Sequence, residues 1–534
     1  MQLEEDVEQW ISLPGDILHH VFTYLPSRSL VNSSAVCRWW RSVSRQDRLW
    51  RPIFLDEFHS VVSQAPVCHG LADEYGMIKR GCPSTLVEIV DDFGYVIDHV
   101  TFSPFGSFYA VCGRGAALCL YESERRSLVE ERDLNKSLGW RSIQNASFSP
   151  DEMILLIEGE KSTGQTEMAT YRICLAEMCL HFVCRLPSSS HFSTWFDNDW
   201  ILANEVYPIN LSSSIAKSIS NLILYKSHLT QKEAQTEPET LYLHRFLNQE
   251  APPFNAIVCE TVSPRFRRVV QMAREAVNEG KSLNFKMSEL QLIDEELNED
   301  AQMNKLKELL DRDEKCFNCY LHEQDECQCA CHVLRQECLL IYGRKAEGAK
   351  SCISFNIIDF IKMREEAKGE DRNKSVELRP DDDLYSFLSR NVSRPDHEIT
   401  LDGRLIHLQL SSDHSTLYAA IDSSITGDMG QIEIRSFDLR TMVHEKRTFY
   451  GGLQPNMEGR EGNYHPSLTS TSTYFLFCCS GTEVVVWSRV HRGPVLTRLQ
   501  HPNSVRAVAA HPQGKFLVAA VDDILYIWTP AFAQ

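Results

Sequence analysis

A short unit of strand, turn and strand that returns along the chain constrains the fold more than any other feature. In HVTFSPFGSFYAVCGRGAALCLY, His99 to Tyr121, apolar and polar residues alternate, a Ser-Pro-x-Gly turn follows, and the later strand ends in an aromatic residue. The same layout returns from Ala146, from Leu405 and from Val505, at a spacing typical of repeats of about 40 residues. One such unit cannot bury both of its faces alone, so it is stable only beside others of its kind.

Counting these units predicts a mainly β fold, a β-propeller of about seven blades. The expected blades begin near His99, Ala146, His191, Phe254, Leu405, Pro466 and Val505. We expect a strand near Leu86 to Val90 to complete the last blade. Joining the two ends of the propeller in one blade would remove a free sheet edge.

Residues 1–60 have a helical period instead. In LPGDILHHVFTYL, residues 13–25, apolar residues recur on one helical stripe, with Pro14 in the expected first turn. A second segment runs from Leu30 to Val43, with Ser27 and Ser29 as candidate caps, and a third follows Asp47. The pattern predicts a small module of three short helices.

Charge and the missing apolar runs exclude several classes of protein. The chain has 54 Lys and Arg against 73 Asp and Glu, a net charge of −19, so it should repel bare nucleic acid. It has no run of about 18 apolar residues, so we expect no membrane span. Met1 to Trp10 carries four acidic residues and no secretory pattern. We therefore expect a cytoplasmic protein, with the nucleus and the centrosome as further locations, and 18 reduced cysteines.

The strand pattern fails in two stretches, which divide the chain. Pro264–Gln336 has apolar residues at helical spacing on an acidic background, and Lys362–Pro395 is highly charged, which favours flexibility. The expected organisation is a helical module at 10–56, a linker at 57–84, blades at 85–263, a helical and Cys-rich insertion at 264–336, strands at 337–361, an acidic flexible insertion at 362–397 and the last blades at 398–534.

The helical module resembles the F-box, which docks on the Skp-type adaptor of cullin-RING ubiquitin ligases. The resemblance implies that its apolar residues divide between a small core and an adaptor-binding face. They are Leu13, Pro14, Ile17, Leu18, Val21, Phe22, Leu25, Leu30, Val36, Cys37, Trp40, Leu49 and Trp50. The alternative is a helical cap on the propeller that binds no adaptor.

The repeats resemble WD repeats, although the match is partial. His501, Asp522 and Trp528 stand where a WD repeat places residues that hydrogen-bond across a blade. Thr529 replaces the Asp of the WD dipeptide, and Trp487 is followed by Ser488 in the preceding unit. The fold is therefore a firmer prediction than any single polar network.

Together the two resemblances cover most of the chain and identify it as similar to F-box/WD-repeat proteins. This implies the substrate-recognition subunit of an SCF-type ligase, bridging adaptor and cullin to a target protein that is ubiquitinated for proteasomal degradation. It also implies a role in control of centrosome duplication. The resemblance implies no catalytic residue, and the sequence has no Gly-x-Ser-x-Gly, phosphate-binding loop or His-Glu-x-x-His.

Two alternatives for the function remain open. The chain could be a WD-repeat scaffold outside any ligase. It could also dock on a cullin-4-type ligase through Phe437, Asp438, Leu439 and Arg440, which resemble a Trp-Asp-x-Arg box. In the simpler interpretation of this box, Asp438 and Arg440 form a local surface ion pair.

Cysteine and histidine crowd one part of the first insertion, and we expect either a structural zinc ion or a redox-sensitive loop there. The candidate ligands are Cys316, Cys319, His322, Cys327, Cys329, Cys331, His332 and Cys338. No other cofactor is expected. Arg114, Arg344, Arg492 and Arg506 are candidates for reading an acidic or phosphorylated target, or are solvated surface residues.

Overall fold

The computed structural model describes residues 13–58, 70–91, 93–174, 176–187, 193–196, 198, 200–208, 218–226, 240–248, 254–259, 337–345, 351–359, 395–411, 414–422, 432–439, 443–453, 468–471, 475–489 and 495–530. The chain divides into two compact units. The first comprises Met1–Leu134, Met429–Ile434 and Arg447–Gln534, and the second Asn135–Asp428 and Arg435–Lys446. Within the described ranges, no helix combines the length and apolar character needed to cross a membrane.

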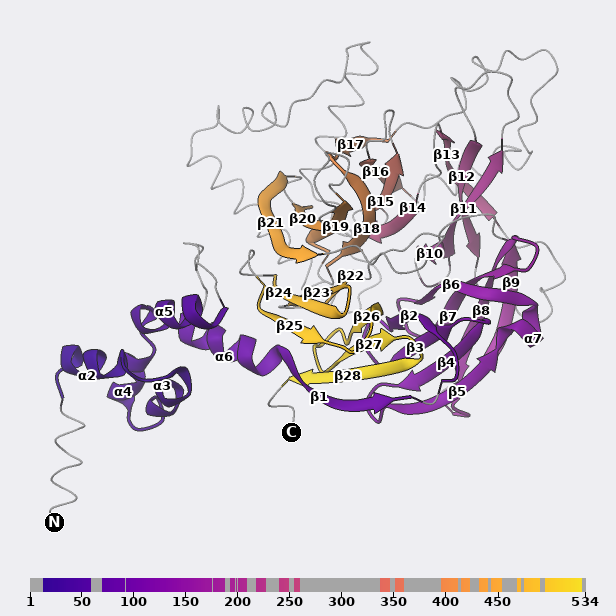
Figure 1. The fold of residues 1–534 in the computed structure, drawn as a ribbon. Coiled ribbons are helices and arrows are strands. Elements are labelled where there is room, and N and C mark those ends of the chain that lie inside the picture. Colours follow the sequence, from indigo (N-terminus) through magenta and orange to yellow (C-terminus); the bar gives the residue numbers. More distant parts are fainter. Residues whose placement is uncertain are drawn as a thin grey trace, which may run out of the picture. The chain divides into compact units, whose positions relative to one another are not determined.

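The amino-terminal module contains more helices than the sequence pattern predicts. Its helices are α2 (Gly15–Phe22), α3 (Ser27–Ser33), α4 (Arg38–Ser44) and α5 (Asp47–Phe58), as Figure 1 shows. The expected second helix is two helices, because Cys37 has extended backbone and its Sγ accepts a hydrogen bond from the Trp40 backbone N–H at 3.4 Å, which caps α4. The N-cap residue of α3 is Pro26, and no side chain caps this helix. The predicted caps at Ser27 and Ser29 are therefore wrong. Helix α2 likewise begins after Pro14 without a side-chain cap.

A further helix, α6 (Leu71–Gly81), lies in the stretch expected to be a linker, and α7 (Leu134–Leu138) follows the second sheet. Asp47, the first residue of α5, accepts a hydrogen bond from the Leu71 backbone N–H at 2.9 Å and so caps α6. Arg45 and Asp73 form an ion pair at 2.6 Å beside this contact. Helix α6 then leads directly into the first strand (Figure 1).

The first unit contains three four-stranded antiparallel sheets. One is made of β1 (Pro83–Val90), β28 (Ile524–Pro530), β27 (Leu517–Val521) and β26 (Val505–Ala510). The next is made of β2 (Ile97–Phe102), β3 (Phe108–Gly113), β4 (Ala117–Glu122) and β5 (Ser127–Asp133). The third is made of β22 (Leu468–Ser470), β23 (Phe475–Ser480), β24 (Glu483–Ser488) and β25 (Thr497–Gln500).

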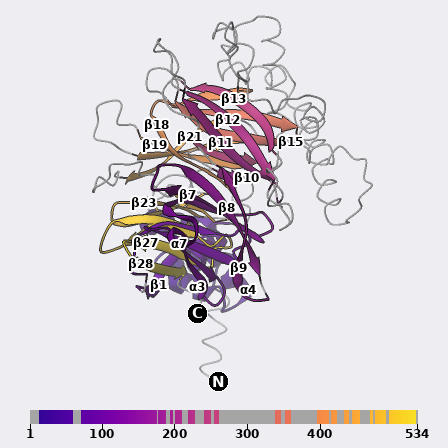
Figure 2. The ribbon, with the colours of Figure 1, turned by 90° about the vertical axis from the view of Figure 1, so that its right-hand side faces the viewer.

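Four more sheets of the same design begin in the second unit, and Figure 2 shows the strands of one, β10 to β13, side by side. The first two contain β6 (Trp140–Phe148), β7 (Ile154–Lys161), β8 (Thr166–Cys174) and β9 (Cys179–Pro187), then β10 (Ser193–Trp195), β11 (Trp200–Pro208), β12 (Ser218–Lys226) and β13 (Thr240–Asn248). The others contain β14 (Phe254–Cys259), β15 (Glu337–Lys345), β16 (Ser351–Asp359) and β17 (His397–Thr400), then β18 (Arg404–Leu410), β19 (Thr416–Asp422), β20 (Ile432–Asp438) and β21 (Val443–Leu453).

These seven sheets are the blades of a seven-bladed β-propeller, which confirms the predicted fold class. The expected completing strand is β1, which pairs with β28 from Pro83↔Pro530 to Val90↔Leu525. This pairing joins the beginning and the end of the repeats in one blade and covers an edge. Both long stretches without strand pattern fall in a single blade, one between β14 and β15 and the other between β16 and β17.

Strand β27 shows how a blade core is built in the first unit. Its residues are buried on both faces, and successive side chains point to opposite sides. Leu517, Ala519 and Val521 pack in the cluster that contains β23, whereas Val518 and Ala520 pack in the cluster that contains β3. The small alanines let neighbouring sheets approach closely. Gly106 serves the same purpose, because a Cβ there would lie 2.6 Å from the His511 ring.

Candidate functional site

The helical module has a compact apolar core. Leu18, Phe22, Leu30, Leu49 and Trp50 are between 0 and 3% exposed, and Val43 and Phe54 lie with them in one cluster. The Trp50 indole N–H donates to the Ser44 carbonyl at 2.7 Å, so the buried ring keeps its polar group satisfied. These side chains are almost entirely covered, so their main role in the described structure is to stabilise the module.

Other apolar residues of the same helices point outward. On α2, Ile17 is 51% exposed and Val21 38%, and Tyr24, just after the helix, is 76% exposed. Their spacing of four and three residues places them on one stripe, separate from the buried stripe of Leu18 and Phe22. Val31, Val36, Trp39 and Leu55, elsewhere in the module, are exposed as well. We call these seven residues the exposed apolar set.

Trp39 is held in place although it is partly exposed. Its indole N–H donates to the Leu13 carbonyl at 3.2 Å, and its ring lies against the first turn of α2, where a Cβ on Gly15 would be 3.1 Å from the ring. A small pocket of about 280 Å³ lies between the end of α2 and α5, lined by Phe22, Thr23, Leu25, Leu49, Pro52, Ile53 and Asp56. The module therefore presents fixed apolar surface together with a recess.

The predicted adaptor residues thus fall into three groups. Leu18, Phe22, Leu30, Leu49 and Trp50 are core; Leu13, Leu25, Cys37 and Trp40 are half-buried; Pro14, Ile17, Val21 and Val36 are exposed. Sequence reasoning missed Tyr24, Val31, Trp39 and Leu55, which are exposed as well. The helical period gives the buried stripe, but only the packing of four helices decides which remaining apolar residues stay uncovered.

Helix α6 brings one unusual acidic group into the module. Glu74 is buried, and desolvation raises the pKa of its carboxyl to about 7. Its neighbour Tyr75 stacks obliquely on Trp50, with ring centroids 4.8 Å apart. Glu74 therefore titrates near neutral pH at the junction between the module and the first blade.

Of the blade residues predicted from the WD-repeat resemblance, His501 and Trp528 are hydrogen-bonded to each other. Trp528 donates its indole N–H to His501 Nε2 at 3.1 Å, and burial lowers the pKa of His501, which favours the neutral ring that can accept this bond. Asp522 occupies the β27–β28 turn with φ of 53°, and it accepts hydrogen bonds from Asn503 at 3.0 Å and Arg506 at 3.4 Å. Trp487 is fully buried and packs edge-on against Phe449.

The arginines considered for reading an acidic target are paired with carboxylates of the protein. Arg506 contacts Asp98 at 3.7 Å as well as Asp522, and Arg114 contacts Asp98 at 3.3 Å. Arg344 contacts Glu398 at 3.6 Å. These pairs compensate the positive charge locally, whereas Arg492 lies outside the described residues.

The candidate second-adaptor box is not presented as the sequence suggested. Phe437 is 2% exposed and belongs to a core cluster, as does Leu439. Asp438 is half-buried, and Arg440 lies outside the described residues. The aromatic position of the box is therefore a blade-core residue.

Most of the predicted metal ligands also lie outside the described residues, and of the eight only Cys338, at the start of β15, falls within them. Among the described residues a different group meets: Cys174, Glu177, Cys179 and His181, whose ligand atoms lie within 4.8 Å of one another. The spacing Cys-x-x-Glu-x-Cys-x-His was the available signal. The sequence analysis did not single out this spacing, because only the strand register places Cys174 opposite Cys179.

Comparison with known proteins gives the class. Residues 10–56 match the family model described as F-box-like. The chain therefore combines an F-box-like module with a seven-bladed β-propeller.

The similar curated proteins are F-box/WD repeat-containing proteins of low sequence identity. A segment of 150 residues is 24% identical to F-box/WD repeat-containing protein 5 of Homo sapiens, covering 28% of this chain and 26% of the relative. The same protein of Rattus norvegicus matches at 24% and that of Mus musculus at 23%, with the same coverage. The match therefore spans about a quarter of these relatives.

Solved structures are more distant. The Cps50 (Swd1) β-propeller domain of Myceliophteria thermophila matches with a TM-score of 0.43 and 11% identity, over 84% of this chain and 99% of that one. Kuenenia stuttgartiensis hydrazine synthase matches with a TM-score of 0.43 and 10% identity, over 84% and 98%. The propeller assignment rests on the strand order of the chain itself.

Proposed function

We propose that this chain is the substrate-recognition subunit of an SCF-type ubiquitin ligase. In this role the F-box-like module binds a Skp-type adaptor and, through it, the cullin, while the propeller holds the target protein. The observation that carries the proposal is the exposed apolar set on a module whose other apolar residues are buried or half-buried. A surface of this kind gains free energy when a partner removes it from water.

The chain needs no reacting side chain in this role. A receptor accelerates ubiquitin transfer by holding the target near the charged conjugating enzyme, which raises the effective concentration of the two. The target is then degraded by the proteasome. We further propose that this happens in the cytoplasm and at the centrosome, in control of centrosome duplication, which follows from the resemblance alone.

Co-purification from cells tests the proposal. The full chain should retain the Skp-type adaptor and cullin, whereas the double variant Ile17→Asp/Val21→Asp should lose both, because it places two carboxylates on the surface to be buried. Leu128→Asp is the matched control, since Leu128 is 50% exposed on β5, outside the module. Failure of the unchanged chain to retain the adaptor would overturn the proposal.

A WD-repeat scaffold and a cullin-4 receptor are the alternative functions. A scaffold would retain its partners in the Ile17→Asp/Val21→Asp variant. Docking through the Phe437 box is disfavoured because Phe437 is buried in a blade core. Retention of a cullin-4 complex that is lost in Asp438→Ala would favour that alternative instead.

A further inference from the structure

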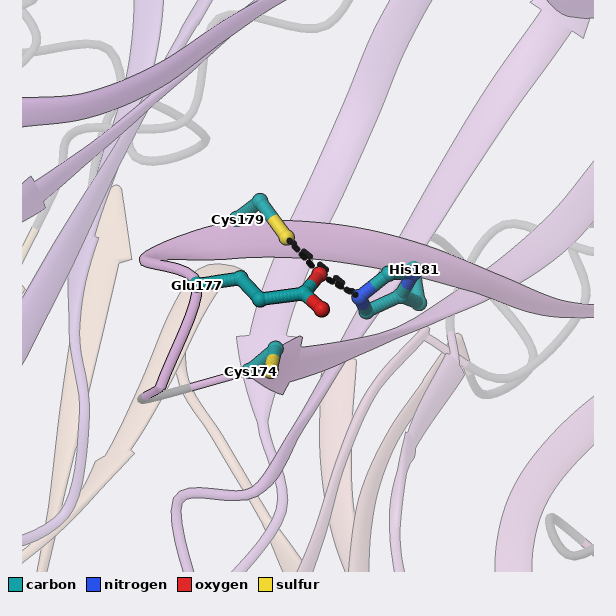
Figure 3. Close-up of side chains that lie close together, drawn as sticks. All are labelled: Cys174, Glu177, Cys179 and His181. Atoms are coloured by element: carbon teal, nitrogen blue, oxygen red, sulfur yellow. Dashed lines mark hydrogen bonds and ion pairs between the residues drawn. The ribbon is translucent and has the colours of Figure 1, made fainter.

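The hairpin that joins β8 to β9 brings four potential metal ligands together within eight residues. The two strands are antiparallel, and Cys174↔Cys179 is the last pair of their register before the turn. Side chains of directly opposed residues share a face, and residues two apart along a strand share it too. Cys174, Cys179 and His181 therefore project on one side, and Glu177 reaches them from the turn (Figure 3).

The opposite face anchors the hairpin. Ile173 and Leu180 pair in the register between the two strands and are 2% and 1% exposed, so they hold the strand ends in the blade. Burial of these two side chains fixes the strand positions from which Cys174, Cys179 and His181 project. The ligand set is thus arranged by the sheet before any metal binds.

The distances suit a tetrahedral ion. Glu177 Oε2 lies 3.1 Å from His181 Nε2 and 3.5 Å from Cys179 Sγ, and Cys179 Sγ lies 3.3 Å from His181 Nε2. Around a tetrahedral Zn²⁺, bonds of about 2.0 Å to nitrogen or oxygen and about 2.3 Å to sulfur place neighbouring ligand atoms about 3.3–3.8 Å apart. The Glu177, Cys179 and His181 ligand atoms therefore need to move by only a few tenths of an ångström, and Cys174 Sγ lies within 4.8 Å of each of them.

We propose that the β8–β9 hairpin binds one zinc ion through Cys174 Sγ, Cys179 Sγ, His181 Nε2 and a carboxylate oxygen of Glu177. Both thiols lose their protons to solvent on binding, and His181 ligates as the neutral ring with its proton on Nδ1. Two thiolates and one carboxylate leave the occupied site with one net negative charge. Arg172, which pairs with His181 in the register and is exposed, is a cation on the same face that offsets this charge.

The corresponding hairpin of the preceding blade shows that a hairpin at this position does not need cysteine or histidine in order to form. The β4–β5 hairpin closes through Glu122↔Ser127, where the β8–β9 hairpin closes through Cys174↔Cys179, and its turn contains Glu124, Arg125 and Arg126. There Arg126 pairs with Glu88 at 3.1 Å and Arg125 with Glu122 at 4.0 Å. A hairpin at this place in a blade therefore forms without cysteine or histidine, which supports a separate role for these residues at β8–β9.

Metal content of the purified full chain tests the site. Because the chain has 18 cysteines, the measurement uses a background in which Cys316, Cys319, Cys327, Cys329 and Cys331 are serine. This background, prepared under reducing conditions and equilibrated with Zn²⁺, should hold one equivalent of zinc. Cys174→Ser/Cys179→Ser and His181→Ala should each lose that equivalent, and Glu124→Gln, the control in the β4–β5 hairpin, should keep it.

Titration with Co²⁺ provides a second measurement on the same proteins. The background chain should develop the visible bands of tetrahedral cobalt with thiolate ligands, and Cys174→Ser/Cys179→Ser should not. Circular dichroism verifies that this variant is folded, which is expected because both cysteine side chains are partly exposed. Equal zinc in the background chain and the Cys174→Ser/Cys179→Ser variant would overturn the proposal, as would a Cys174–Cys179 disulfide that persists under reducing conditions.

Discussion

The helical module and the propeller blades differ in how many large apolar side chains they leave exposed. Of the 15 large apolar side chains that are exposed in the described part of the chain, seven lie within residues 13–58. In the blades, by contrast, strands such as β3, β23 and β27 are buried at every position. A blade obtains neighbours on both faces from the repeat itself, whereas the module has none for its outer side. The difference supports the proposal that the module docks on another molecule.

The largest expected effect is a loss of stability in the helical module that leaves the blades unchanged. Trp50→Ala removes a fully buried ring and the hydrogen bond to Ser44, and should cost the module about 3–5 kcal/mol. Hydrogen exchange should show lost protection in α2 to α5 with β2 to β4 unchanged. Trp39→Ala, at a ring 45% exposed, is the control and should leave exchange nearly unchanged. Equal loss in the blades would show that module and propeller unfold as one unit.

A smaller effect is expected inside a blade. Trp528→Phe keeps most of the ring but removes the donor to His501 Nε2, and should lower the free energy of unfolding by about 1 kcal/mol. Because burial lowers the pKa of His501, the folded protein loses stability as pH falls and the unfolded histidine takes up a proton. Denaturant unfolding of both proteins at pH 7 measures the difference. No change in the Trp528→Phe variant would mean that this bond does not stabilise the blade.

A pH-dependent effect is expected at Glu74. The folded carboxyl keeps its proton up to pH of about 7, whereas the unfolded one loses it above its ordinary value of 4.5. Stability should therefore fall as pH rises from 4.5 to 7 and stay level above that. Glu74→Gln does not titrate, so its gain in melting temperature over the unchanged chain should be larger at pH 8 than at pH 5. A gain equal at both pH values would contradict the raised pKa.

The sequence allowed the repeating parts of the fold to be predicted better than the sites. Strand period and turn residues located the seven blades and the completing strand β1, because each blade repeats the same local chemistry. Helix α6 was missed because one half-exposed helix in a polar stretch resembles a linker. Phe437 was taken for a docking residue because a short motif does not reveal burial. The β8–β9 ligands were missed because only strand register places Cys174 opposite Cys179.

Hydrogen exchange with added adaptor tests the central claim most directly. Addition of a Skp-type adaptor to the full chain should slow exchange in α2 to α4, where most of the exposed apolar set lies, and leave β22 to β28 unchanged. The Ile17→Asp/Val21→Asp variant should show no slowing at the same adaptor concentration. Unchanged exchange throughout the module of the full chain at saturating adaptor would contradict the account.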